Sequence, residues 1–515
     1  MATENRTINS IKNILGSYMV QILTLILGFV NRSLFLYCLS ADYLGLNSLF
    51  SSVISMLSLA ELGVSSAITF HLYKPIREND VEHIKALVNF YKACYTVIGL
   101  IIFLLGLCLI PILPNIVNFE TEVDINLYVV YLLYLFNTSL SYWVYAYLGT
   151  VIAAHQKNYI IYKIRCIFKI INVVVCMIVL YISRNYYAYI FSQSALILIE
   201  NICTRQKAYE MYPYLKDIKT NKLDKKEISN IRKDVSALLT AKISNVLSSG
   251  CDNIIVSTFV STTMVGYISN YTMLQTNVIS MVNSVAGATT AGIGNLVAEG
   301  KREKQIKIFK ELDFINFYLL YFVCISLITL SSPFIELWLG EGYVIDYRII
   351  SCIVGNYFVL YSHNVMWVFK DAMGLFRYMK YIQLIQGIFN LLLSIVLCKF
   401  SGPKGVYLAS FITNLVISYT LHTYYLFRYG FGESVVRQII VMLFRLGFTA
   451  VVTTIINGVN LFFPEITIWT FLYRCIVTLL ITNIFFWLVF HRTTEWSSML
   501  QRGKNLIKSK KRFIR

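Results

Sequence analysis

A positive charge lies inside an apolar stretch near the start of the chain. Arg32 is the charged residue of the run from Ile14 to Leu39, which is otherwise almost wholly apolar. At the centre of a bilayer an arginine costs about 2.5–3.5 kcal/mol on insertion scales. Lipid does not accept such a charge and a water-filled cavity does, so Arg32 is a functional-site hypothesis.

Polar side chains recur at helical spacing in four apolar stretches. Steps of three and four residues place them on one face of a helix. Small polar residues commonly hold helices together, whereas a stripe that contains a charge is expected to face a water-filled cavity. The stripes are Ser17, Gln21, Thr24, Gly28 and Arg32; Ser51, Ser55, Ser58, Glu61, Ser65 and Thr69; Lys242, Asn245, Ser249 and Asp252; and Gln383, Gln386, Asn390 and Ser394.

The composition indicates the elements that must position these groups. Of the 515 residues, 57% are hydrophobic and only 14% are charged, so we predict an all-α polytopic membrane protein. A membrane barrel would show a period of two, which these stretches lack. Segments of roughly 17 to 25 apolar residues can span a bilayer, and about fourteen are predicted: 14–36, 44–72, 86–110, 125–152, 162–182, 186–204, 235–260, 264–297, 312–332, 344–369, 379–398, 405–427, 437–457 and 466–490.

The distribution of positive charge predicts the orientation in the membrane. The chain has a net charge of +18, and most of its 45 Lys and Arg residues lie in the even-numbered loops and the two tails. The opposite loops carry only Arg184, Arg348, Lys399 and Lys404. The positive-inside rule then places both termini in the cytoplasm. We expect the basic C-terminal tail to contact anionic lipid and not nucleic acid.

The chain lacks motifs of enzymes and metal sites. Its eleven cysteines show no CxxC spacing, and no HExxH, GxSxG or GxxxxGK[ST] motif occurs. The loops expected outside the membrane are too short for a catalytic domain. We therefore predict no enzymatic activity, no metal and no cofactor, and a membrane-bound glycan-processing enzyme is the least favoured alternative.

A faint internal repeat suggests two halves. Aligning YLGLNSLF with MVGYISNY places Gly45 on Gly266 and Arg32 on Asn253. Two six-helix lobes around a central cavity are expected from such a repeat, with the substrate near the middle of the membrane. The predicted organisation is an N-lobe of six helices at 1–208, a basic cytoplasmic linker at 209–234, a C-lobe of six helices at 235–430, two extra helices at 431–490 and a basic cytoplasmic tail at 491–515.

Several runs together resemble a known family over nearly the entire chain. They are KISNVLSSGCDNIIVSTFVSTTMVGYISNYTML, VNSVAGATTAGIGNLVAEG, PFIELWLGEGY, GLFRYMKYIQLIQGIFNLLLSIVL and GPKGVYLAS. They resemble the Wzx-like oligosaccharide and polysaccharide flippases of the multidrug/oligosaccharidyl-lipid/polysaccharide (MOP) superfamily. The resemblance implies a bacterial inner-membrane protein that flips undecaprenyl-pyrophosphate-linked oligosaccharide by alternating access, coupled to a proton or sodium gradient. Implied partners are that lipid-linked substrate, membrane lipids, glycosyltransferases and a polysaccharide polymerase.

The resemblance gives the charged residues a chemical role. An arginine fork offers planar, bidentate hydrogen bonds to a pyrophosphate, so Arg32 is expected to bind it, with Lys242 as a second positive charge. Asn31 and Asn245 are available to sugar hydroxyls.

Two carboxylates are assigned to ion coupling or gating. Glu61 lies in the predicted span 44–72, and Asp252 lies in the same predicted span as Lys242. Their depths suggest two pairs: Arg32 with Asp252 towards the outside, and Glu61 with Lys242 towards the cytoplasm. A drug or cation antiporter of the same superfamily is the main alternative function. Its cavity should be net acidic, whereas here two cations balance two carboxylates.

Overall fold

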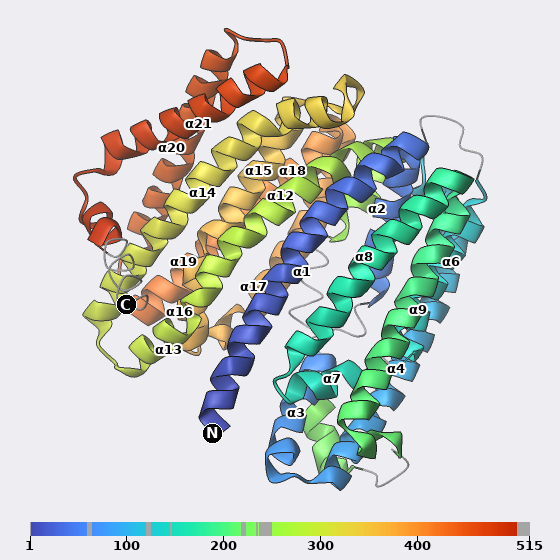
Figure 1. Cartoon of the computed structure of the whole chain (residues 1–515). Coiled ribbons are helices and arrows are strands. Elements are labelled where there is room, and N and C mark those ends of the chain that lie inside the picture. Colours follow the sequence, from blue (N-terminus) through green and yellow to red (C-terminus); the bar gives the residue numbers. More distant parts are fainter. Residues whose placement is uncertain are drawn as a thin grey trace, which may run out of the picture. The chain divides into compact units, whose positions relative to one another are not determined.

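The computed structural model describes residues 2–58, 64–119, 125–144, 147–217, 223–232, 235 and 250–501. Every regular element in these ranges is a helix (Figure 1), which confirms the predicted all-α fold. By length and composition, eight helical stretches of the described chain can cross a membrane, and a bent pair of helices makes up to nine. Each predicted span coincides with one helix or with successive helices, except 235–260, most of which lies outside the described residues.

The chain divides by compactness into two units. The first comprises residues 1–246 and 256–266, and the second comprises residues 247–255 and 267–515. The sequence predicts a single C-lobe from residue 235 to 430, so the assignment of 256–266 to the first unit differs from that prediction.

The first unit is a bundle in which α1 packs on α8, α8 on α9, and α4 on α6. Figure 1 shows α1, α8 and α9 side by side. α6 and α7 are inclined to each other by 47°. The helices of this unit are α1 (Ala2–Cys38), α2 (Ala41–Leu57), α3 (Val64–Glu78), α4 (Val81–Leu109), α5 (Leu113–Ile116), α6 (Leu127–Trp143), α7 (Tyr147–Ala154), α8 (Asn158–Ser183) and α9 (Tyr186–Met211), with 3-10 turns at Ile110–Ile112 and Pro213–Lys216.

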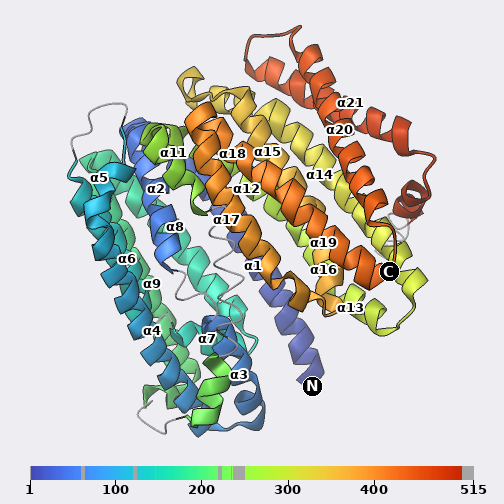
Figure 2. The ribbon, with the colours of Figure 1, turned by 180° about the vertical axis from the view of Figure 1, so that it is seen from behind.

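The second unit packs α17 on α18, α18 on α15, and α15 on α14. Figure 2 shows α17 and α18 next to each other. Its helices are α12 (Thr262–Ala288, whose first residues belong to the first unit), α13 (Thr290–Ala298), α14 (Arg302–Leu339), α15 (Tyr347–Ser362), α16 (Asn364–Ala372), α17 (Phe376–Ser401), α18 (Pro403–Thr413), α19 (Thr420–Tyr425), α20 (Val435–Asn460) and α21 (Ile468–Phe490), with π-helical segments at Asn414–Tyr419 and Leu426–Phe431. The short α11 (Asp252–Phe259) is divided between the two units.

Polar residues begin several of these helices. Asp80 accepts a hydrogen bond from the main chain of α4, and Asn126, Asn185 and Asp346 do the same for α6, α9 and α15. Such caps satisfy main-chain N–H groups that have no partner within the helix. They fix where each apolar helix starts.

The last two helices carry apolar side chains on their outer faces. In α20, Ile440 and Phe444 are exposed while Val452 and Ile456 are buried. An exposed apolar surface of this extent is what lipid contact requires. With the apolar helices described above, it makes the chain a multi-pass membrane protein.

Residues 256–266 are held on the first unit by hydrogen bonds. Thr262 and Asn118 exchange two of them, at 2.6 Å and 3.0 Å. The Ser257 hydroxyl donates to the main chain of Ile116 at 2.7 Å, and the Thr263 hydroxyl donates to the buried carboxylate of Asp42. The tip between α11 and α12 is therefore a specific contact of the first unit.

Candidate functional site

Arg32 lies in the C-terminal half of α1, the helix that packs on α8. Its side chain is half-buried. The neighbouring Asn31 donates a hydrogen bond from its amide to the Tyr189 hydroxyl at 3.2 Å, and Arg32 interacts electrostatically with the same tyrosine. Tyr189 of α9 therefore interacts with two consecutive residues of α1.

A chain of tyrosine hydroxyls lies next to this group. The hydroxyls of Tyr186 and Tyr134 are 3.1 Å apart, and Tyr134 donates to the side chain of Asn47 at 2.6 Å. Phe35, one turn beyond Arg32, packs its ring against Tyr186 and Tyr189 with centroids 6.1 and 5.3 Å apart. Packing and hydrogen bonds together fix these side chains in α1, α2, α6 and α9.

This arrangement can bind an anion that carries hydroxyl groups. A guanidinium presents several donors in one plane to phosphate oxygens. Phenols and amides both donate and accept hydrogen bonds, so they match sugar hydroxyls. Arg32 and Asn31 are consecutive residues of α1, and their role in substrate binding stays a prediction.

The other predicted site residues are Lys242, Asn245, Glu61 and Asp252. Lys242, Asn245 and Glu61 lie outside the described residues. Asp252 begins α11 and belongs to the second unit, where it interacts electrostatically with Tyr357 and Tyr407. Its Oδ1 atom is buried and has no hydrogen-bond partner in the described part of the chain.

The tyrosines of the site are absent from the residues predicted by sequence. Tyrosine is common at membrane interfaces, so abundance alone selects none of the 37 in this chain. Helical spacing could have selected two of them, because Tyr186, Tyr189 and Gln193 follow steps of three and four residues on α9. Such spacing places them on one face of the helix.

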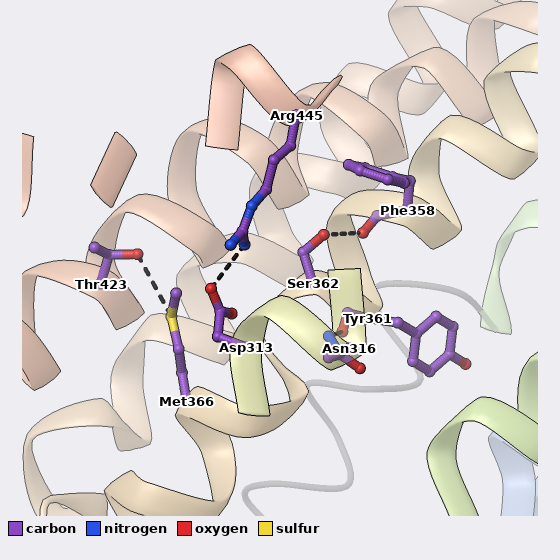
Figure 3. A network of polar contacts seen from close by, with 8 residues as sticks. All are labelled: Asp313, Asn316, Phe358, Tyr361, Ser362, Met366, Thr423 and Arg445. Atoms are coloured by element: carbon purple, nitrogen blue, oxygen red, sulfur yellow. Dashed lines mark hydrogen bonds and ion pairs between the residues drawn. The ribbon is translucent and has the colours of Figure 1, made fainter. Parts of the chain in front are cut away.

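A second intramembrane arginine has a structural partner that sequence reasoning did not identify. Arg445 of α20 donates to Asp313 of α14 at 2.7 Å, as Figure 3 shows. Asp313 is 3% exposed, and the Arg445 guanidinium lies 4.7 Å from the centroid of the Phe317 ring. This ion pair ties one of the two extra helices to the rest of the second unit.

The polar stripe of α17 holds helices together. Gln386 donates to Asn414 at 3.4 Å, and Asn390 donates to Ser410 and Thr413 at 2.9 and 3.2 Å. These side chains are buried. A stripe without a charge therefore serves packing here, as is common for small polar residues in membrane helices.

No protein-family model and no curated protein matches the sequence. Solved structures do match. The lipid II flippase MurJ, in an inward closed conformation, is similar with a TM-score of 0.65 at 16% identity, covering 93% of this chain and 99% of that chain.

Two MATE transporters are also similar in structure. One is an inward-facing multidrug resistance MATE family transporter of the MOP superfamily, with a TM-score of 0.63 at 11% identity, covering 85% of this chain and 99% of that chain. The other is a mutant of the Vibrio cholerae MATE transporter VcmN, with a TM-score of 0.56 at 12% identity, covering 84% and 99%. At these identities the likeness shows the fold: this chain has the polytopic helical fold of MurJ and the MATE transporters.

Proposed function

We propose that this chain is a flippase that moves undecaprenyl-pyrophosphate-linked oligosaccharide repeat units from the inner to the outer leaflet of the bacterial plasma membrane. The observation that carries the proposal is Arg32, half-buried in an apolar helix beside Asn31 and the Tyr189 hydroxyl. A pyrophosphate that crosses hydrocarbon needs such a cation, and the attached sugar needs neutral hydrogen-bonding groups.

The fold supports transport by alternating access. One structure with this fold is a lipid flippase and others are multidrug transporters. In this proposal the oligosaccharide serves surface polysaccharide synthesis, glycosyltransferases supply it and a polysaccharide polymerase uses it. Both termini are cytoplasmic.

A drug or cation antiporter is the second candidate function. The fold does not discriminate strongly, because TM-scores to the two kinds of transporter are 0.65 and 0.63. The charge of the site does discriminate between the two functions, because Arg32 repels a cationic substrate. This electrostatic argument favours the anionic lipid-linked sugar.

The decisive experiment is a flipping assay with purified protein in liposomes that contain a fluorescent lipid-linked oligosaccharide. Label that becomes accessible to a membrane-impermeant quencher faster than in protein-free liposomes supports the proposal. A matched assay with ethidium tests the antiporter function. Transport of ethidium without flipping of the lipid-linked sugar would overturn the proposed function.

Ion coupling is proposed at Glu61 and Asp252. A carboxylate at such depth can bind a proton or a sodium ion in one state of the cavity and release it in another. Glu61→Gln and Asp252→Asn should each remove the dependence of the flipping rate on a proton or sodium gradient imposed on the liposomes. If both variants keep the dependence of the unmodified protein, the two residues have a structural role only.

A further inference from the structure

The first unit contains a polar cavity of about 440 Å³ that is separate from the group around Arg32. Its walls come from α3, α4, α6, α7, α8 and α9, and most of its lining side chains carry a hydroxyl, an amide or a charge. Ligand pockets of proteins commonly measure roughly 300–1,000 Å³. The cavity is thus large enough for a small molecule and unusually polar for the interior of a helix bundle.

The backbone of α7 creates room for this cavity. α6 and α7 are inclined by 47°, and α7 presents Gly149 and Ala153 to the cavity. A Cβ atom added to Gly149 would remain 3.7 Å from Ile161 and 3.8 Å from Thr204. A Cβ atom at this position would therefore make ordinary van der Waals contact with both of these side chains. Interrupted helices that line a cavity are a usual feature of substrate sites in transporters.

Aromatic rings and hydroxyls form one side of the cavity. Tyr91 and Tyr95 have ring centroids 4.4 Å apart, Tyr95 and Tyr142 have theirs 5.5 Å apart, and the Thr150 hydroxyl is 3.5 Å from that of Tyr91. Sugars combine apolar C–H faces with hydroxyl edges, so tyrosine rings beside hydroxyls suit them.

Charges and an amide form the other side. Arg165 of α8 and Glu200 of α9 both line the cavity, and Arg165 and Lys169 interact electrostatically with Glu200. The Asn201 amide nitrogen is buried without a hydrogen-bond partner in the described part of the chain. Buried donors are normally satisfied, which points to a bound molecule that accepts a hydrogen bond there.

We propose that this cavity, lined by Tyr91, Tyr95, Arg165, Glu200 and Asn201, binds a carbohydrate, namely a sugar of the lipid-linked oligosaccharide. The proposal rests on the proposed function and adds a glycan-recognition site to it. A pyrophosphate would prefer an uncompensated cation, and a lipophilic cation would prefer a less polar wall with an uncompensated acid. Aromatic faces, hydroxyls and charges of both signs in the lining favour a neutral or zwitterionic sugar.

The test uses the reducing oligosaccharide released by mild acid from the lipid-linked pool of the native cells. Its binding to the full chain in nanodiscs is measured by saturation-transfer NMR. Asn201→Ala, which removes the buried donor, should weaken binding by at least about tenfold. Gly149→Leu, which fills the cavity, should abolish it. Gly447→Leu is the matched control, because nothing lies within 4 Å of a Cβ atom at Gly447, and it should bind like the unmodified protein.

Two further probes make the result specific. Inorganic pyrophosphate should bind with unchanged affinity to Asn201→Ala and Gly149→Leu and lose affinity in Arg32→Ala, which also shows that the cavity variants are folded. Oligosaccharide binding that survives both Asn201→Ala and Gly149→Leu would overturn the cavity site, as would displacement of the oligosaccharide by tetraphenylphosphonium. If the unmodified protein flips the lipid-linked oligosaccharide but Asn201→Ala and Gly149→Leu still bind the released oligosaccharide normally, only the cavity site is rejected. Absence of flipping rejects the proposed function.

Discussion

Two arginines within the apolar helices of this chain have different surroundings. Arg445 donates to a buried carboxylate, Asp313, and lies over the Phe317 ring. Arg32 is instead placed beside an amide and a phenol, Asn31 and Tyr189. A buried ion pair such as that of Arg445 stabilises a helix contact, whereas we propose that Arg32 binds the substrate. The two residues should therefore respond differently to substitution.

Arg32→Ala should lower flipping of the lipid-linked oligosaccharide by roughly two orders of magnitude while the protein still inserts and folds. The reason is the loss of a charged ligand for pyrophosphate. Arg32→Lys should recover only part of the rate, because an ammonium lacks the planar fork. The measurement is the liposome assay at equal protein content, with Arg184→Ala, in the loop after α8, as the control. Full flipping by Arg32→Ala would remove the proposed role.

Arg445→Ala and Asp313→Ala should each destabilise the folded protein by about 3–5 kcal/mol, since each leaves one buried charge without its partner. The double replacement Arg445→Met with Asp313→Leu should be much closer to the unmodified protein. Unfolding in mixed micelles, followed by tyrosine and tryptophan fluorescence, measures these differences. Flipping should persist in the double variant, because the pair belongs to the packing. Two single variants as stable as the original chain would contradict this account.

At the scale of elements, two glycines that the internal repeat aligns lie at one helix crossing. A Cβ atom on Gly45 of α2 would overlap the main-chain oxygen of Thr262, and one on Gly266 of α12 would overlap that of Ala41 and approach the main chain of Gly45 at 3.0 Å. Main-chain atoms cannot move aside like a flexible side chain. Both positions therefore require glycine so that the two backbones can approach closely.

Gly45→Ala and Gly266→Ala should each destabilise the crossing by about 1–3 kcal/mol, the usual cost of overpacking. Reaction of Thr263→Cys with a maleimide, in a chain whose own cysteines are replaced, should become faster as the tip between α11 and α12 separates from α2. Gly292→Ala is the matched control, because no atom lies within 4 Å of its Cβ position, and alanine there should be neutral or slightly stabilising. Equal labelling rates in all three variants would show that the crossing tolerates a side chain.

The positions of the helices follow from the sequence much better than their interruptions do. Apolar runs locate the helices because any spanning segment must be apolar. Hydropathy depends on side chains and carries no information on where the main-chain hydrogen-bond pattern changes. The sequence therefore did not predict that α15 and α16 are separate helices that meet at His363, or that π-helical segments lie on both sides of α19. Similarly, α8 begins at Asn158, four residues before the predicted span 162–182.

In the candidate site too, some residues could be predicted from the sequence and others could not. A charge in an apolar run stands out in the sequence, so Arg32 and its neighbour Asn31 could be predicted. Tyr134 and Tyr186 could not, because their roles depend on contacts between α6 and α9 that bring distant residues together. Asp313 is hidden for the same reason, since its partner Arg445 is 132 residues away.

At the scale of the whole molecule, the proposed flippase function requires access to the substrate from each side of the membrane in turn. Residues 256–266 belong to the first unit although the helices on either side of them continue in the second. The two glycines that the repeat aligns, Gly45 and Gly266, both lie in the first unit. A transporter of this kind must break and re-form contacts at each end of its cavity, and pairs of opposite charge can serve as reversible contacts.

We expect Arg32 and Asp252 to form such a contact when the outer side closes, and Glu61 and Lys242 when the inner side closes. With about 1.5 Å of rise per residue from the middle of each predicted span, Arg32 and Asp252 lie roughly 10 and 7 Å towards the outside. Glu61 and Lys242 lie roughly 5 and 7 Å towards the cytoplasm by the same count. Pyrophosphate competes for the two cations, so loading of substrate weakens the contact on the side where it binds.

Charge exchange tests this gating scheme, because breaking one partner of a buried pair is costly whereas exchanging both can restore it. Arg32→Asp with Asp252→Arg, and Glu61→Lys with Lys242→Glu, should regain the closed conformation that each single variant loses, even though flipping stays lost. The measurement is crosslinking between cysteines placed at the outer or inner ends of the two lobes, in a chain whose own cysteines are replaced. Each single variant serves as the reference for its double. If the doubles lose as much crosslinking as their single variants combined, the pairs do not form, and Arg32 acts on the substrate alone.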